Sequence, residues 1–156
     1  MKFNTSGGYF TAIVNKKNGE RNYAAHLQKN LLTNNGRDQF HISCYTATST
    51  LTRGFGYIAL TTDTAAAAAG DTALTGELAS NGFSRADATT KSHTTGTNST
   101  TVEHTFTASG TVNAINKSGT FNNASSTILG HEAVFGTTAS LISGDTLKVT
   151  WTLNLG

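Results

Sequence analysis

Two Glu/His pairs are the residues whose types and spacing could support acid–base chemistry. Glu103 precedes His104, and His131 precedes Glu132, in two stretches where apolar and polar residues alternate. If these stretches pair as strands, the four side chains can come within reach of one another and exchange protons. The same alternation puts both histidines on apolar faces, where a hydrogen-bonded core or interface histidine is the more common role. We expect that role and keep the acid–base group as the alternative.

The other motifs for metal, phosphate and nucleophile chemistry are incomplete. The five histidines show no His-x-x-x-His spacing, and the lone Cys44 cannot build a zinc site by itself. Asp63 and Asp71 could ligate calcium, but they lack the alternating Asp/Asn run and closing Glu of a calcium loop. No Gly-x-Ser-x-Gly occurs, and the Gly-Phe-Gly of residues 54–56 lacks the third glycine of a dinucleotide-binding turn. The sequence therefore predicts no catalytic residue, no metal site, no cofactor and no enzymatic activity.

Five consecutive alanines, residues 65–69, lie between Asp63 and Asp71. Alanine is the best helix former, but Gly70 ends the run at once and no apolar face develops along it. We expect a low-profile connector, or a helix of one to two turns, over the edge of the fold. Asp71 is then placed to cap the turn that follows.

Composition and charge exclude several classes of protein. Lys and Arg number 11 against 9 Asp and Glu, without a basic run, so nucleic acid is not an expected partner. No window approaches the ~20 apolar residues of a membrane span. The N-terminal residues do not form a signal-peptide pattern, and the lone cysteine suits synthesis in a cytosol. Abundant Thr, Asn, Ser and Gly favour strands and turns over helices.

Period-two alternation defines most of the expected strands. In residues 146–155, Leu147, Val149 and Trp151 alternate with threonine and lysine, which is typical of a half-buried strand. Gly144 and Asp145 mark the turn before it. Similar patterns predict further strands over residues 56–60, 82–89, 101–108, 112–115 and 128–135.

Turn and capping residues define the rest of the chain. Asn18-Gly19 favours a type I′ turn and predicts a hairpin over residues 9–29. The second arm also fits helical spacing, and we favour the strand. Thr33 can cap a short helix over residues 33–41. Residues 89–100 are polar, carry no apolar anchor and predict a mobile loop.

These elements together predict an all-β fold. We expect a single domain over residues 1–156, an antiparallel two-sheet β-sandwich of jelly-roll or Ig-like type, with its sandwich strands in residues 56–155. About eight strands and one short helix are expected, and 156 residues suffice to bury a core without disulfides.

Four segments resemble a family of small structural proteins of tailed bacteriophages. They are "QKNLLTNNGRDQF", "GYIALTTDTAAAAAGDTALTGEL", "INKSGTFNNASSTILGHEAVF" and "ISGDTLKVTWTLNL", in residues 28–155. The residues that match the first two family patterns are Asn30, Leu31, Thr33, Asn34, Gly36 and Asp38, then Asp71, Thr72, Ala73, Leu74 and Glu77. Arg37 stands where the family has leucine, and alanine replaces a proline in the alanine-rich segment.

The resemblance implies a non-enzymatic structural protein of a tailed-phage virion, with no catalytic residues to carry over. It would self-associate on the particle surface, as a capsid decoration or cement protein; the alternative is a tail fibre or a receptor- or glycan-binding module, with residues 89–100 as its candidate loop. The implied partners are further copies of the chain, in a homo-oligomer for which a trimer is one option, and the major capsid protein or tail proteins. Neither nucleic acid nor membrane is expected as a partner. The implied location is the virion, after synthesis in the host bacterial cytoplasm.

Overall fold

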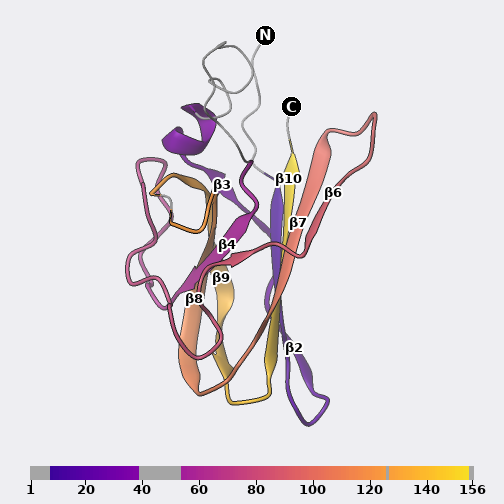
Figure 1. The fold of residues 1–156 in the computed structure, drawn as a ribbon, viewed down its shortest axis with the longest axis vertical. Helices are drawn as coiled ribbons and strands as arrows, with labels where there is room; N and C mark the ends of the chain where they lie inside the picture. The colour runs from indigo at the N-terminus through magenta and orange to yellow at the C-terminus, as the bar shows by residue number, and fades with distance from the viewer. Residues whose placement is uncertain (1–7, 39–53, 126, 155–156) are drawn as a thin grey trace.

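Two five-stranded antiparallel sheets pack face to face in this computed structural model, which describes residues 8–38, 54–125 and 127–154 (Figure 1). The predicted all-β two-sheet sandwich is confirmed. The described residues contain ten strands, more than the eight expected, and two of these strands are only two residues long.

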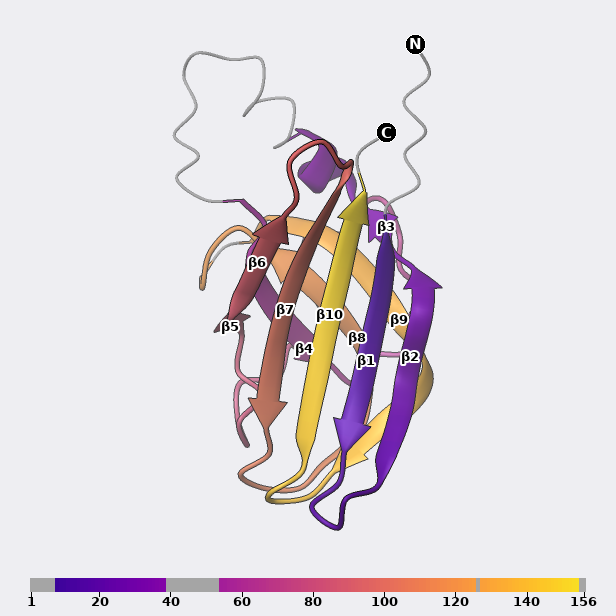
Figure 2. The same ribbon diagram turned by 90° about the vertical axis from the view of Figure 1, so that its right-hand side faces the viewer.

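Sheet A has the strand order β2-β1-β10-β7-β6, and Figure 2 shows it facing the viewer. Its strands are β1 (Tyr9–Asn15), β2 (Arg21–Lys29), β6 (Thr90–His93), β7 (Ser99–Thr107) and β10 (Thr146–Asn154). Sheet B has the order β3-β9-β8-β4-β5. Its strands are β3 (Leu31–Leu32), β4 (Tyr57–Thr61), β5 (Ala86–Asp87), β8 (Val112–Phe121) and β9 (Leu129–Leu141).

The core between the sheets is made by alternate residues of each strand. On β10, Leu147, Val149 and Trp151 are fully buried, as their alternation predicted. The Trp151 ring lies 4.8 Å from the ring of Phe10 on β1. Phe10 in turn lies 5.1 Å from Phe135 on β9, so aromatic contacts join the two sheets across the core.

The N-terminal segments follow the turn and capping residues. The hairpin of β1 and β2 turns at Gly19, whose φ of 89° requires the conformational freedom of glycine. The expected type I′ turn is wrong, because Asn18 lacks the positive φ that it requires and residues 16–20 connect the strands. The second arm is a strand, not a helix. Thr33 accepts a hydrogen bond from the Gly36 amide (3.1 Å) and begins a helix over residues 34–38, while residues 39–41 of the expected helix lie outside the described residues.

Two expectations for the middle of the chain are wrong. Residues 89–100 are not a loop: β6 pairs with β7 from Thr90 opposite Glu103 to His93 opposite Thr100, and only residues 94–98 form the connection. An edge strand can be held by backbone hydrogen bonds alone, so it needs no apolar side chain. Residues 82–89 are mostly irregular: Gly82 ends a turn with φ 85°, and only Ala86–Asp87 form a strand.

Residues 62–76, which we call the cover segment, lie on the side of sheet B away from sheet A (Figure 1). Leu74 of this segment is buried in a second, smaller apolar cluster on that face, together with Ala59, Phe121 and Leu129. The Leu78 amide donates to the Leu60 carbonyl (2.8 Å), which fastens the chain just after this segment to β4. Sheet B is therefore buried on both faces over part of its length. No helix among the described residues is long and apolar enough to cross a membrane.

Candidate functional site

A buried lysine lies beneath the cover segment, between two carboxylates. The Lys117 Nζ is 2.8 Å from Oδ2 of Asp63 and 2.9 Å from Oε1 of Glu132. The Lys117 side chain is 3% exposed and that of Glu132 is 1% exposed, whereas Asp63 is 23% exposed. Charged groups are rarely buried to this extent unless they are paired, so this group is the first candidate for a site.

The strands of sheet B position these side chains. Lys117 on β8 is in register with Thr61 on β4, two residues before Asp63. Glu132 on β9 is in register with Gly119, the next residue of β8 on the same face. A Cβ at Gly119 would collide with the side chains of Leu74 and Leu129, which fill the space above it. The charged group therefore borders the apolar cluster under the cover segment.

The two aspartates that flank the alanine-rich stretch accept hydrogen bonds from its backbone amides. Asp63 Oδ1 accepts a hydrogen bond from the Ala65 amide (3.2 Å), and Asp71 Oδ2 accepts one from the Ala68 amide (2.9 Å). The Asn116 side chain also donates to the Asp63 carbonyl (3.2 Å). Residues 65–69 form no helix, so the connector alternative is correct and the short-helix alternative is wrong.

The electrostatics of the group are asymmetric. Burial raises the pKa of Glu132 to about 7, the nearby Asp71 carboxyl raises it as well, and Lys117 opposes both. Burial alone would lower the pKa of Lys117, but its two carboxyl partners together raise it. The hydrogen bond from Lys117 lowers the pKa of Asp63. Lys117 and Asp63 thus favour their charged forms, while Glu132 is neutral below about pH 7 and ionised above it.

The second oxygen of Glu132 has no hydrogen-bond donor. Its Oε2 is buried and unpartnered, although the Asp71 carboxyl is close enough to raise the pKa of Glu132. Two ionised carboxylates can only accept hydrogen bonds, so a proton on either one would complete the contact between them. Oε2 of this buried carboxyl is therefore the atom that can carry a proton.

The alternative acid–base group of Glu103, His104, His131 and Glu132 is not assembled. Glu103 lies on the outer face of sheet A, bound to Lys148 (3.0 Å) and Thr150 (2.8 Å), while Glu132 lies on the outer face of sheet B. The whole sandwich separates the two glutamates. They do not reach the histidines either, because consecutive residues of a strand point to opposite faces.

The histidines occupy the interior sides of the sheets. His131 has its Nδ1 3.0 Å from Thr120 Oγ1 and its ring 6.2 Å from Trp151, and burial lowers its pKa to about 4. The His104 ring packs 4.6 Å from Phe106, and burial lowers its pKa as well. Both environments favour the neutral imidazole. The expected core role holds for His131, which is 9% exposed.

At Asp63, one of the two residues of the calcium site considered above, the neighbouring cation is the ammonium group of Lys117. Within the described parts of the chain, no three His, Cys, Asp or Glu side chains gather closely enough to hold a metal ion. The Lys117 ammonium binds Asp63, one of the two carboxylates that the calcium hypothesis paired. No motif in the sequence singled out Lys117. What could have pointed to a buried lysine is its place inside a strand pattern, between polar residues that are buried in the structure. Cys44 and His41 lie outside the described residues.

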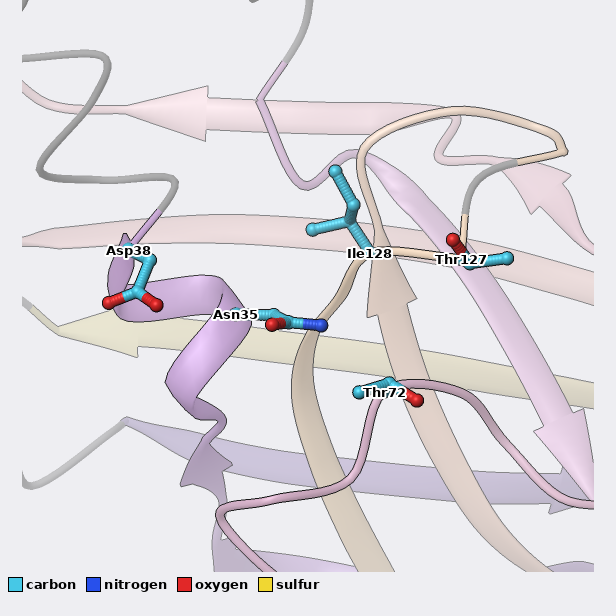
Figure 3. A pocket seen from close by; sticks show the side chains of 5 residues that line it. All are labelled: Asn35, Asp38, Thr72, Thr127 and Ile128. Atoms are coloured by element: carbon cyan, nitrogen blue, oxygen red, sulfur yellow. The ribbon is translucent and has the colours of Figure 1, made fainter.

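An open cleft lies at one end of the sandwich (Figure 3). It is lined by Asn35 and Asp38 of the helix, Thr72 of the cover segment, and Thr127 and Ile128 just before β9. Asp38, Thr72 and Thr127 are exposed, so the cleft is open to solvent. Its side chains can form hydrogen bonds, but they present no nucleophile paired with a base.

Exposed apolar side chains lie along one edge of sheet A, on its outer face. Tyr23 (50% exposed) and Leu27 (59%) are on the edge strand β2, and Tyr9 (42%) is on its neighbour β1 (Figure 2). We call these three residues the edge patch. Leu27 sits in a bulge opposite Thr11, whose hydroxyl oxygen accepts a hydrogen bond from the Leu27 amide (3.2 Å). Leu27 has φ 47°, a left-handed conformation that costs a non-glycine residue free energy.

Comparison with protein-family models, with curated proteins and with solved structures gave no match. The edge patch, the open cleft and the charged group beneath the cover segment are the features on which a functional assignment rests.

Proposed function

We propose that this chain is a non-enzymatic structural protein of a tailed-phage virion, which self-associates on the particle surface as a capsid decoration protein. The four segments that resemble the phage family supply the virion part of the proposal. The edge patch is the observation that carries self-association.

The edge patch has the properties of an interface between copies of the chain. It combines two tyrosines with a leucine, and aromatic residues are enriched in such interfaces. Leu27 is held exposed in a conformation that costs free energy, and this cost would be offset if its side chain became buried on association. The patch lies on an edge strand, which a second copy can approach without displacing other elements.

The neighbouring surface would not oppose association. The outer face of sheet A carries threonines from several strands, and its central charges, Glu103 and Lys148, neutralise each other across 3.0 Å. The pairing of these two charges lessens the repulsion that identical charged surfaces would experience at the centre of this face. Many copies could therefore sit close together on a particle.

The double variant Y23K/L27K tests self-association, because both side chains are exposed and their replacement spares the core. Sedimentation and light scattering should show an oligomer for the wild-type chain and a monomer for the variant. S92K, on the exposed edge strand β6 at the other side of sheet A, is the matched control and should keep the wild-type mass. A wild-type chain that is monomeric at high concentration would contradict the self-association.

The virion part needs a separate measurement. Quantitative mass spectrometry of purified particles from cells that carry the gene should find many copies per particle, and cryo-electron microscopy should locate them on the capsid. Absence from particles, or only a few copies, would contradict the decoration role.

The open cleft favours a second candidate, the glycan-binding module. Asn35, Asp38 and Thr72 offer hydrogen-bonding groups for sugar hydroxyls, next to the apolar Ile128. A glycan array should then show binding that is lost in N35A/D38A. The turn of residues 94–98 is tested separately by replacing it with Gly and Ser. Failure to bind any host surface material would contradict this candidate.

A further inference from the structure

We propose that Lys117 condenses with Asp63 to form an intramolecular isopeptide bond, with the Glu132 carboxyl carrying the proton between them. The bond would join Nζ of Lys117 to Cγ of Asp63. It would tie the beginning of the cover segment covalently to strand β8.

The three groups already have the proximity that such a condensation requires. The Lys117 nitrogen lies 2.8 Å from one oxygen of Asp63 and 2.9 Å from one oxygen of Glu132. Asp63 is held in place independently of Lys117, because its carbonyl accepts a hydrogen bond from Asn116 (3.2 Å) and its amide donates to Thr61 Oγ1 (3.0 Å). Fixed proximity of this kind converts a slow bimolecular reaction into an efficient intramolecular one.

Burial favours the condensed product. The side chains of Lys117 and Glu132 are almost completely buried, next to an apolar cluster that includes Leu74 and Leu129. Moving a charged ammonium and a carboxylate out of water is costly, whereas a neutral amide needs only its hydrogen bonds. Asp63 remains 23% exposed, which leaves the released water a path to solvent.

Glu132 has the properties of the proton carrier. Burial brings its pKa to about 7, so it can both accept and donate a proton near neutrality. Its Oε1 contacts the lysine nitrogen, and its Oε2 has no partner. Asp63 is the better acyl donor, because its Oδ1 receives the Ala65 amide hydrogen (3.2 Å) and so has a donor for the charge that develops on it.

The reaction balances without a cofactor. Glu132 takes one proton from the Lys117 ammonium and passes it to Oδ2 of Asp63, so that the neutral amine attacks Cγ of a carboxylic acid and forms the N–C bond. The second proton lost by nitrogen then follows the same route to Oδ2. The C–Oδ2 bond breaks, and the oxygen leaves with both protons as water. One ammonium and one carboxylate thus become one amide and one water molecule.

Intact mass spectrometry of the purified full-length chain tests the proposal. The measured mass should be lower than the sequence mass by one water molecule, and tandem spectra should identify a branched peptide that joins Lys117 to Asp63. D63A keeps the buried Lys117–Glu132 pair and should show its full sequence mass. D63N should lose ammonia in place of water and reach the same final mass as the wild-type chain.

Two further variants test the assigned roles. K148M removes the amine of an exposed ion pair, Lys148 with Glu103, and should still lose one water molecule. E132Q should form the bond at least tenfold more slowly, as followed by the mass change after refolding. D63A remains informative if E132Q does not fold.

Four results would overturn the proposal. They are a wild-type chain at its full sequence mass, a water loss that persists in D63A, a branched peptide that joins Lys117 to Glu132, and a folded E132Q that forms the bond at the wild-type rate. The first rules out the bond, the next two rule out Asp63 as its partner, and the last rules out the proton carrier.

Discussion

His131 and Glu132 are consecutive residues on β9 whose side chains are buried on opposite faces of sheet B. Burial lowers the pKa of His131 to about 4 and raises that of Glu132 to about 7. Both side chains therefore favour their neutral forms between these values. The two shifts therefore change stability in opposite directions. The lowered pKa of His131 makes the free energy of unfolding rise with pH, and the raised pKa of Glu132 makes it fall with pH.

The variant E132Q should reveal how the titration of His131 changes the stability of the fold with pH. In the wild-type chain the contribution of Glu132 opposes that of His131 between about pH 4.5 and 6.5, so the free energy of unfolding should rise less steeply there than in E132Q. E132Q removes one of them, and the free energy of unfolding should then rise with pH across this window by up to about 3 kcal/mol. His104, whose pKa is also lowered by burial, acts in the same direction.

Urea denaturation at several pH values between 4.5 and 6.5 measures this slope. The slope is the informative quantity, because any loss of stability that does not depend on pH leaves it unchanged. A wild-type slope as steep as that of E132Q, or a flat slope in E132Q, would contradict the opposing contributions.

D145N should weaken the fold at neutral pH and reduce its sensitivity to acid. Asp145 accepts hydrogen bonds from the Ile142 amide (3.1 Å), the Lys17 amide (2.8 Å) and Lys16 Nζ (3.0 Å), and these lower its pKa. A lowered pKa means that the stabilisation is present above the ordinary value of 3.8 and is lost as pH falls below it.

Thermal melting between pH 2 and pH 7 follows this effect. The melting temperature of D145N should be lower at pH 7 and should approach that of the wild-type chain at pH 2. D87N, which breaks the exposed pair with Lys91, is the control and should melt almost as the wild-type chain does at pH 7. An equal deficit for D145N at both ends of the pH range would argue against this role.

G36A should destabilise the protein although the residue is helical. Alanine normally stabilises a helix by about 1 kcal/mol relative to glycine. At Gly36, however, a Cβ would collide with the backbone carbonyl of Gly130, which cannot move aside as a side chain would. We expect a loss of about 1–3 kcal/mol by denaturant titration. G70A, where nothing lies within 4 Å of the added Cβ, should be nearly neutral; equal effects of the two changes would contradict the packing.

L27G should separate the stability of one chain from its association. Glycine removes the cost of the left-handed backbone at φ 47°, and little burial is lost because Leu27 is 59% exposed. The isolated chain should gain about 1 kcal/mol in denaturant titration at low concentration. Its oligomer should nevertheless dissociate more readily in sedimentation experiments. A variant that associates as strongly as the wild-type chain would remove Leu27 from the interface.

Local signals in the sequence predicted the elements that depend on nearby residues. The alternation around Trp151 identified β10, and Asn18-Gly19 identified the first hairpin, because turn and strand preferences act over a few residues. The strand β6 was missed because its pairing with β7 is a backbone property that leaves no apolar pattern. Phe83 was placed in a strand because residues 82–89 alternate, but it reaches the core from a turn.

The charged group was only partly visible in the sequence. Asp63 and Asp71 were singled out for their spacing, yet Lys117 is 54 residues away from Asp63 along the chain. In the alternation of β9, Glu132 falls on the outward-facing side. Alternation alone predicts that a residue on this side is exposed to solvent. Glu132 is buried because the cover segment packs on the outer face of sheet B, and this contact depends on the folded arrangement and not on any local pattern.

The antiparallel pairing of β1 with β10 also determines how the sandwich would respond to mechanical force. Their ladder contains seven residue pairs, from Tyr9 with Thr152 at one end to Asn15 with Thr146 at the other. Tension applied through Gly8 and Asn154 would load only the first pair and open the ladder one pair at a time, as a zipper opens. Tension applied through Asn18 and Asn154 would shear all seven pairs at once. The same domain should therefore yield easily when pulled from one end and resist strongly when held by its opposite ends.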